Sequence, residues 1–377
     1  MKMNNTLAQR VFGKGLLVGL AITACVMPEL DAAASSINAY YRRLDASVYT
    51  ATSSPVYLPN QWAMTNEGRL RGFVRAANGL SVAASANVYL DLFQPLSGQI
   101  SLGNSSTLNL ESDLFLTSSA SLSVGSSGAT LASSQAVAIH LGGDFTHPGS
   151  RTIFVNSPEL TIDGGGYSYR FNDESSTMRI APGSTLTLRN MVINGLSSSH
   201  QIKGPGTLKL QNCVVNLPTS DVTWTASWGN VGITIADDVV VRGGGTFVFG
   251  SAAPLAINQN SMLSFDNNTT FLFAPQDFSR TRLTFADSSS ILRLNGSTFC
   301  APGEGGFAGV SLTNGTLLLD NKVTFSNSYH SVLANGITFG NGTASDDLAV
   351  RMNAGASINL NCGMIDYQNV DELVAVG

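Results

Sequence analysis

The sequence predicts an all-β protein whose short strands follow one another in a single parallel coil, a β-helix or β-solenoid. Three observations lead to this prediction. A short apolar phrase recurs at the spacing expected for one turn of a solenoid, and Gly, Ser, Thr and Asn separate short β-branched runs. Only 12% of the 377 residues are charged, against about a quarter in an ordinary globular protein, which disfavours a surface made of helices.

Residues 1–34 have the three parts of a secretory signal peptide. Lys2, Arg10 and Lys14 precede an apolar run over residues 15–27, and three alanines follow at residues 32–34. The run is shorter than the about 20 residues that span a bilayer. We therefore predict cleavage after residue 34, export, and a mature chain without a membrane span. A second interpretation stays open, because the residues ending at Cys25 resemble a lipobox and would place a lipid anchor there.

Residues 35–78 lack the phrase and are predicted to form an N-terminal cap. A cap is expected there because an open end of a coil exposes unpaired strand edges. Looser copies of the phrase begin near residue 79, so the β-helix itself is predicted over residues 79–377. No comparable segment follows Ile358, and the C-terminal coil is predicted to lack a cap of its own.

The repeated phrase is an apolar residue, any residue, an apolar residue and a polar residue, usually followed by Asn or Gly. Its copies begin at Leu160, Leu186, Leu208, Val239, Leu263, Leu292, Leu317 and Ile358, with a weaker copy at Ile337. Each copy is predicted to form one coil, so that Leu186 and Leu188 stack on Leu208 and Leu210 about 4.8 Å away. Continuous inner rows of aliphatic side chains would then form the core.

The Asn that ends the phrase is predicted to have a structural role. A sharp turn between sheets favours left-handed backbone angles, which Gly and Asn tolerate best. Stacked Asn amides also bond from coil to coil. The predicted ladder consists of Asn190, Asn212, Asn267 and Asn321.

Two stretches, residues 160–166 and 186–193, resemble the pectin-lyase-like superfamily of right-handed parallel β-helices. The resemblance extends over most of residues 79–377 and implies a right-handed coil, in agreement with the general preference of parallel crossovers. Bacterial members include polysaccharide lyases and hydrolases, and also adhesins and surface proteins. The chain is similar to this superfamily in its repeat, which identifies a fold and not an activity.

The catalytic residues that the resemblance would imply are not assembled in the sequence. Polygalacturonase-like members carry paired aspartates, a Gly-His-Gly segment and an Arg-Ile-Lys segment. Asp237 and Asp238 offer a carboxylate pair, but none of the four histidines lies between glycines, and residues 201–203 lack the Arg and precede the aspartates. We therefore predict no catalytic residue and interpret Asp237 and Asp238 as a solvated turn.

The outward polar position of the phrase forms a column of mixed charge. Its members are Asp163, Arg189, Gln211, Arg242, Asp266, Asn295, Asp320 and Asn361. Because opposite charges adjoin at the first pair and again at Arg242 with Asp266, the column predicts a neutral face and not an acidic calcium cleft. No metal and no cofactor are predicted.

Trp224 and Trp228 share one face of a predicted strand in an insertion between coils. Such rings stack on sugars in glycan-binding proteins, and they also pack against a protein core. Both interpretations stay open. Glycan stacking at these two residues is the predicted binding site if the face is exposed.

Function is predicted from these features together. Beyond residue 34 the chain has 17 basic and 23 acidic residues, a net charge of −6, which argues against nucleic acid as a partner. We expect a secreted or cell-surface (outer-membrane or extracellular) structural or adhesive protein that is not an enzyme. Its expected partners are surface glycans or further copies of itself joined end to end. The alternative is a carbohydrate-active lyase or hydrolase, or a glycan-binding module.

Overall fold

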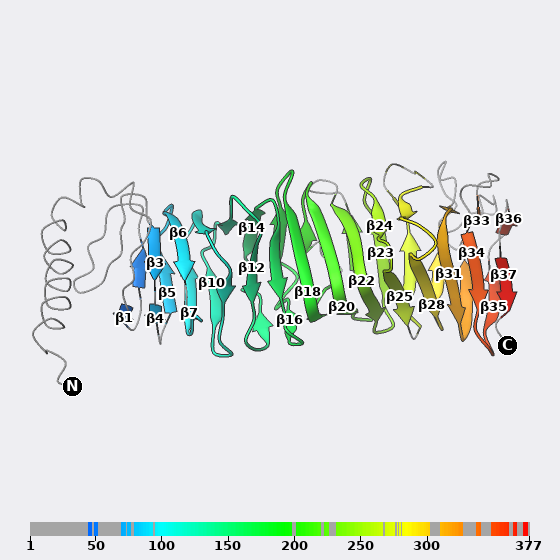
Figure 1. Ribbon diagram of the computed structural model, residues 1–377, viewed down its shortest axis with the longest axis horizontal. Helices are drawn as coiled ribbons and strands as arrows, with labels where there is room; N and C mark the ends of the chain where they lie inside the picture. Colours follow the sequence, from blue (N-terminus) through cyan, green and yellow to red (C-terminus); the bar gives the residue numbers. More distant parts are fainter. Residues whose placement is uncertain are drawn as a thin grey trace, which may run out of the picture.

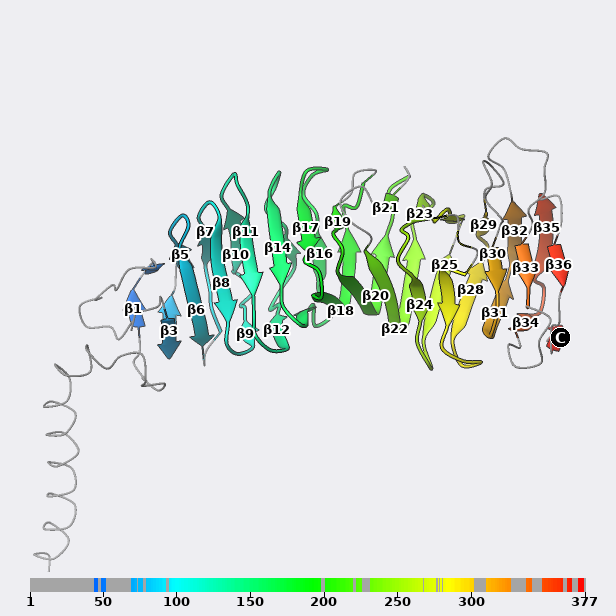
Figure 2. The ribbon, with the colours of Figure 1, turned by 90° about the horizontal axis from the view of Figure 1, so that it is seen from above.

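The structure is a computed structural model, and its described part is an all-β parallel solenoid. It describes residues 44–46, 49–51, 69–72, 74–76, 79–92, 95–197, 201–219, 222–225, 231–266, 268–275, 277, 279, 281–301, 310–326, 337–340, 348–361, 365–367 and 372–375. These residues contain no α-helix. The chain winds in the right-handed sense along one long axis, from β1 at one end to β37 at the other (Figures 1 and 2). The predicted fold class is confirmed for the coil.

Near both ends each strand pairs in parallel with the third strand after it. At the N-terminal end, three successive strands pair with the next three: β1 (Leu44–Ala46) with β4 (Val74–Ala76), β2 (Tyr49–Ala51) with β5 (Gly79–Val82), and β3 (Arg69–Gly72) with β6 (Asn87–Leu92). One turn therefore contains three strands, which we call a rung. Among the described residues, parallel pairing is present from Leu44 onward, inside the segment predicted to be the cap, and the domain boundary at residue 78 stays a prediction.

Two sheets of the N-terminal half continue from this first rung. The seven-stranded sheet contains β3 and β6, the four-stranded sheet contains β2 and β5, and every pair in them is parallel. Their other strands are β7 (Gln99–Leu102), β8 (Ser106–Leu110), β10 (Ser121–Val124), β11 (Ala129–Ala132), β14 (Thr152–Asn156), β17 (Thr177–Ile180) and β19 (Ile202–Lys203).

A 15-stranded sheet, the long sheet, runs through the molecule. Its main path is β9 (Leu114–Phe115), β12 (Val137–His140), β15 (Leu160–Asp163), β18 (Thr185–Asn194), β20 (Thr207–Asn216), β22 (Gly232–Arg242), β25 (Met262–Asp266), β28 (Ile291–Asn295), β31 (Gly315–Asp320), β34 (Leu348–Met352) and β37 (Glu372–Ala375). Its side branches are β13 (Phe145–Thr146), β16 (Ser168–Arg170), β24 (Leu255–Ile257) and β27 (Leu283–Phe285).

Two further sheets complete the C-terminal half. The six-stranded sheet consists of β21 (Val222–Thr225), β23 (Thr246–Gly250), β26 (Thr270–Phe273), β29 (Thr298–Cys300), β32 (Lys322–Ser326) and β35 (Ser357–Asn361). The three-stranded sheet consists of β30 (Val310–Leu312), β33 (Ile337–Phe339) and β36 (Ile365–Tyr367). The last rung is formed by β35, β36 and β37, which pair with β32, β33 and β34.

The predicted stacking of the phrase is confirmed at its centre and is wrong after Leu208 and again near the C-terminus. Leu186 pairs with Leu208 and Leu188 with Leu210, and all four side chains are buried. Leu208, however, pairs with Ile233 in the next rung and not with the phrase copy at Val239. The repeat therefore changes its face of the coil between residues 208 and 239.

The change of face has a physical cause in the long strands β18, β20 and β22. Each bends at a residue in the left-handed region, with φ of 53° at Asn190, 49° at Asn212 and 55° at Asp237. The segments before and after the bend lie on two adjacent faces, so β18 pairs with both β15 and β16, and β22 pairs with both β24 and β25. A phrase before the bend and a phrase after it look alike in sequence but occupy different faces.

The phrase copies near the C-terminus lie in other sheets. Ile337 pairs with Val310 in the three-stranded sheet, and Ile358 pairs with Val323 in the six-stranded sheet. Leu317 instead pairs with Val350, which belongs to no copy of the phrase. The phrase thus predicts a strand with two inward side chains, but it does not predict which face that strand joins.

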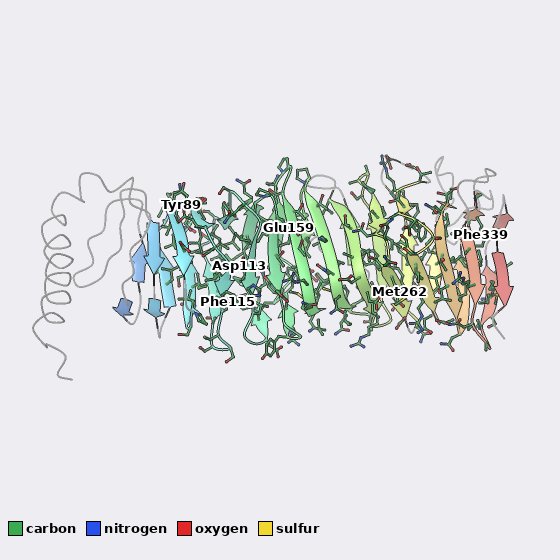
Figure 3. All side chains as sticks on the ribbon, viewed as in Figure 1. Tyr89, Asp113, Phe115, Glu159, Met262 and Phe339 are labelled. Carbon is green, nitrogen blue, oxygen red and sulfur yellow. The ribbon has the colours of Figure 1, made fainter. Side chains whose placement is uncertain are left out.

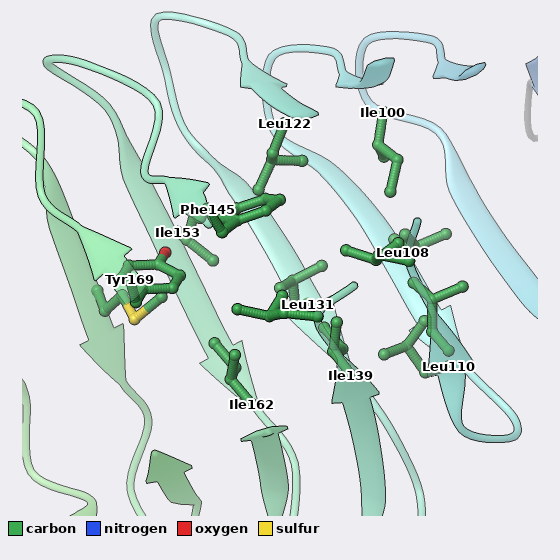
Figure 4. Close-up of a pocket in the computed structure, with 14 residues that line it drawn as sticks. Ile100, Leu108, Leu110, Leu122, Leu131, Ile139, Phe145, Ile153, Ile162 and Tyr169 are labelled. Atoms are coloured by element: carbon green, nitrogen blue, oxygen red, sulfur yellow. The ribbon is translucent and has the colours of Figure 1, made fainter. Parts of the chain in front are cut away.

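The core differs between the two halves. In the N-terminal half it consists mainly of Leu, Ile and Val side chains, which surround an apolar cavity of about 40 Å³ (Figure 4). In the C-terminal half it contains phenylalanines whose rings contact one another, mostly edge-to-face and in two pairs stacked. Phe271 lies 4.5 Å from Phe265 and 5.2 Å from Phe299, measured between ring centroids, and all three are fully buried.

A buried polar pair lies within the N-terminal core. His147 is fully buried directly after β13, and its Nδ1 lies 2.8 Å from the hydroxyl oxygen of Tyr169. Burial lowers the pKa of His147 to about 4, and burial raises the pKa of Tyr169 above its ordinary value. Both rings are therefore neutral at physiological pH, and the hydrogen bond between them satisfies two polar groups in an apolar core.

Candidate functional site

The predicted tryptophan site falls mainly outside the described residues. The backbone of Trp224 belongs to β21 and pairs with that of Phe249 in β23. The side chain of Trp224 and the whole of Trp228 lie outside the described part of the chain. Glycan stacking at these rings stays a prediction.

Asparagine side chains join neighbouring rungs at the bends. Asn212 Nδ2 donates to Asn190 Oδ1 at 2.9 Å, and Asn190 Nδ2 donates in turn to Asp163 Oδ1 at 3.1 Å. Farther along, Asn321 has a φ of 56° and donates to Asn295 at 2.6 Å. These amides support the turns and bond along the axis. Asn267, the remaining member of the predicted ladder, lies outside the described residues.

The outward column on β12, β15 and β18 is a connected cluster of charged and aromatic side chains. Asp163 is paired with Arg189 at 2.7 Å and lies 3.6 Å from the ring nitrogen Nδ1 of His140. The other ring nitrogen of His140 lies 3.6 Å from Asp113, and the ring itself stacks on Phe115 with centroids 4.4 Å apart. Asp113 and Phe115 mark this surface in Figure 3.

The hydrogen bonds and charges around Asp163 keep its carboxyl group ionised and in one position. Partial burial raises the pKa of Asp163, but hydrogen bonds from Arg189, the Gly165 amide and Asn190 together outweigh it and hold the pKa below its usual range. An aspartate held in this way is ionised at neutral pH and acts as an acceptor. It stabilises the contact between rungs and is a weak base.

Asp320 and Arg242, two further members of the predicted column, also bond to side chains of neighbouring rungs. Asp320 accepts hydrogen bonds from Arg293 and from Asn353. Arg242 follows Val241 and Asp266 follows Phe265, which pair between β22 and β25, so the two lie in adjacent rungs as predicted. The guanidinium of Arg242 donates to the side chain of Asn216 in the preceding rung at 2.9 Å. The predicted column is wrong at two other steps, because Gln211 pairs with Ala236 at the bend of β22 and Asn361 pairs with Ser326 in another sheet.

Asp237 and Asp238 are exposed at the bend of β22. Asp237 has the left-handed backbone of the turn, and its carboxylate accepts a hydrogen bond from Gln211 Nε2 at 2.8 Å. Its equivalent positions in the preceding rungs are the ladder residues Asn190 and Asn212. The aspartate therefore occupies a turn position of the coil.

Two cysteines of the described chain, Cys213 and Cys300, are buried. Cys213 lies on the inner face of β20, and burial raises the pKa of its thiol to about 11. Cys300 is likewise buried in β29. A protonated, enclosed thiol packs as a small apolar side chain and is a poor nucleophile.

A polar groove crosses the turns of the N-terminal half. It has a volume of about 460 Å³ and is open to solvent. The turns after β8, β11, β14 and β17 supply most of its lining, with hydroxyls, amides, one carboxyl group and an aromatic ring. Residues that carry these groups include Tyr89, Asn109, Glu111, Ser134, Asn156 and Ser184.

The groove was missed at the sequence level, although a signal for it is present. Tyr89 and Asn109 are the middle residues of two early apolar phrases, and the sheet register places them side by side. Reading the middle residues of successive phrases as one outward column would have brought them together. The turn residues of the groove carry no comparable signal, because loop lengths between rungs vary.

The last rung exposes apolar side chains that continue the core rows. Ile358 and Leu360 of β35 are 37% and 57% exposed, whereas their register partners Val323 and Phe325 are fully buried. The phenylalanines at the position equivalent to Leu360 in β23, β26, β29 and β32 are each followed by a paired strand and are buried. Among the described residues, no later strand of this sheet follows β35.

The described residues contain neither a cluster of metal-ligating side chains nor a helix that could span a membrane. No group of three or more His, Cys, Asp or Glu side chains is placed to hold a metal ion there. Across the same residues, no helix has the length and apolarity needed to cross a membrane.

Comparison with known proteins adds no relative to these observations. No family model, no curated protein and no solved structure matches this chain. The geometry of the coil and the sequence pattern are therefore the basis for the functional argument.

Proposed function

We propose that the protein is an exported, non-catalytic structural or adhesive element of the cell surface. One observation carries the proposal: polar side chains on the outside of the coil bond to their neighbours in adjacent rungs. The pairs of Asp163 with Arg189 and of Asp320 with Arg293 are examples. Groups used in this way stiffen a rod along its axis. A catalytic acid or base needs instead a pKa adjusted to proton transfer and a place beside a substrate.

The shape and the N-terminal sequence support the same proposal. A solenoid presents long repetitive faces, which suit adhesion and display. The charged, apolar and small-residue order of residues 1–34 supports export. Within the pectin-lyase-like superfamily, which the repeat resembles, the surface and adhesin branch is the one that we propose.

The proposal is tested by locating the protein and its processed N-terminus. We expect that a bacterium expressing the full chain exposes it to protease added to intact cells, and that intact mass shows loss of residues 1–34. A lipid-modified mass beginning at Cys25 would support the surface location by the anchored route. A cytoplasmic protein with its complete N-terminus would contradict the proposal.

The polar groove supports a second candidate function, a glycan-binding module. Sugars are bound through hydrogen bonds to amides, hydroxyls and carboxylates and through packing on aromatic rings. The groove offers Asn109, Asn156 and Glu111 beside Tyr89. This combination of groups also fits an adhesive surface protein. The groove crosses several turns of the coil, a length that suits an oligosaccharide.

A glycan array separates the two candidates. We expect the variants Tyr89→Ala and Asn156→Ala each to weaken binding of any captured glycan about tenfold, since each removes roughly 1.4 kcal/mol of contacts. Phe115→Ala, on a different face, serves as the matched control. An array without a binder, together with negative lyase and hydrolase assays, would leave the structural function alone.

A further inference from the structure

We propose that the last described rung, which exposes Ile358 and Leu360, binds the first described rung of a second copy of this chain, so that the protein assembles head to tail. The inference rests on the structural function proposed above and names its partner. It concerns two surfaces, which we call the tail (β35, β36 and β37) and the head (β1, β2 and β3).

The tail carries exposed apolar side chains, and its strands lie at the edges of their sheets within the described chain. Ile358 and Leu360 continue inner rows whose previous members, Val323 and Phe325, are fully buried. Each of the three tail strands stands last in the strand order of its sheet within the described chain. Such edges accept further strands in parallel register, and covering the two apolar side chains would complete the core.

The head has the form that this addition needs. It has three strands in one turn, like the tail, and each of them stands at the other limit of the strand order of its sheet. One turn also takes a similar length of chain at the two ends, as the pairing of Arg69 with Tyr89 and of Ala349 with Glu372 shows. A tail strand and a head strand can therefore continue the same parallel ladder.

Charge distinguishes a second copy from other occupants. Residues 35–76 contain five arginines and two acidic residues, a net charge of +3. Residues 353–377 contain three acidic residues and no basic residue, a net charge of −3. Within the described strands, the head has Arg69 and Arg71 in β3 against Asp45 in β1, a net charge of +1, and the tail has Asp366 in β36 and Glu372 in β37, a net charge of −2. A head-to-tail contact therefore joins opposite charges.

The same charges disfavour the other arrangements. Two tails facing each other would bring together two acidic surfaces, and their strands could not continue in parallel. A head-to-tail contact uses two different surfaces and does not close, so it produces a linear fibre. The fibre would have the cross-section of a single solenoid.

The first experiment compares two exposed apolar residues. Sedimentation velocity and electron microscopy of the secreted full chain should show linear oligomers that lengthen with concentration. Leu360→Ser should weaken association at least about tenfold, because it removes an apolar side chain from each joint. Phe115→Ser is the matched control, since Phe115 is 46% exposed on the side of the coil. It should assemble like the wild type.

The second experiment reverses charge at each end. The tail variant Asp366→Lys with Glu372→Lys and the head variant Arg69→Glu with Arg71→Glu should each fail to assemble alone. Mixing the two, or combining all four changes in one chain, should restore fibres. Far-UV circular dichroism checks that every variant keeps its β structure, so that loss of assembly is not loss of folding.

A protein that stays monomeric at all concentrations would overturn the inference, as would equal effects of Leu360→Ser and Phe115→Ser, or charge variants that mixing does not rescue. Oligomers joined side by side would do the same. None of these outcomes affects the proposed surface location, which protease accessibility and intact mass measure independently.

Discussion

The two halves of the solenoid fill the same three-strand coil in different ways. Between residues 80 and 180 the inner rows are mainly aliphatic, with Phe145, Tyr169 and Phe171 as aromatic members, and leave an apolar cavity bordered by Leu108, Leu131 and Ile139 (Figure 4). Between residues 247 and 339 one inner row, on the six-stranded sheet, consists of phenylalanines that follow one another from rung to rung: Phe247, Phe271, Phe299 and Phe325. Phe325 lies 6.2 Å from Phe299 and 5.9 Å from Phe339 between ring centroids.

The difference shows that the length of the inward side chains determines how completely the interior of the coil is filled. Rungs are spaced by the backbone hydrogen bonds, so the interior can be filled only by side chains that reach across it. An aromatic ring buries a large area and contacts its neighbours in the adjacent rungs. Aliphatic side chains are shorter and leave a gap where the opposing rows do not meet. We expect the phenylalanine half to be the more sensitive to truncation.

The largest expected effect tests this comparison directly. Phe271→Ala should lower the free energy of unfolding by about 3–5 kcal/mol, because it removes the central ring of a packed row. Leu108→Ala, beside the existing cavity, should cost less, about 2–3 kcal/mol. Urea denaturation followed by circular dichroism measures both. Equal costs would show that the cavity does not loosen the N-terminal half.

The next effect depends on pH and belongs to the N-terminal half. Because burial lowers the pKa of His147 to about 4, the unfolded chain binds the proton first as pH falls from 6.5 to 4. The stability contributed by the neutral ring is present above pH 6.5 and is lost as pH falls through this window. The loss is roughly 3 kcal/mol when it is complete.

His147→Gln is the matched variant for this pH effect. It should flatten the dependence of stability on pH between 6.5 and 4, whatever its effect at neutral pH. Hydrogen exchange should increase around residues 145–171 as the wild type is acidified, with a smaller change around residues 247–273. Asp163 contributes its own loss only below about pH 4, near its ordinary pKa. A variant with the same pH slope as the wild type would contradict the assignment.

The smallest effect concerns the bend at Asn212 in β20, which lies between the N-terminal and C-terminal halves of the coil. Asn212→Ala should cost about 2 kcal/mol, because it removes the hydrogen bond to Asn190 and places a Cβ-bearing residue at a φ of 49°. Asn212→Gly should cost about half as much, since glycine accepts that backbone. The difference in melting temperature between the two variants measures the backbone contribution. Equal melting temperatures of the two variants would show that Asn212 stabilises the bend through its hydrogen bond alone and not through its backbone conformation.

The sequence predicted the parallel coil, the inward rows and the left-handed asparagines, because each depends on local chemistry. Alternating apolar residues identify a strand, and Asn190 and Asn212 are residue types that tolerate the bend. The step from Leu208 to Val239 was predicted wrongly. A phrase before a bend and a phrase after it have the same composition, and only the pairing of Leu208 with Ile233 shows which face each one occupies.

By itself, then, the sequence determined the architecture and the ends: a repeated strand phrase, a basic start and an acidic finish of the coil. Only the tertiary structure decided which faces meet, where the groove opens, and that Ile358 and Leu360 are uncovered. The physical reason is that strand formation and charge are properties of neighbouring residues. Register, cavities and exposed core rows depend instead on residues that lie a full turn apart in the chain, and the variable loops between rungs conceal that spacing.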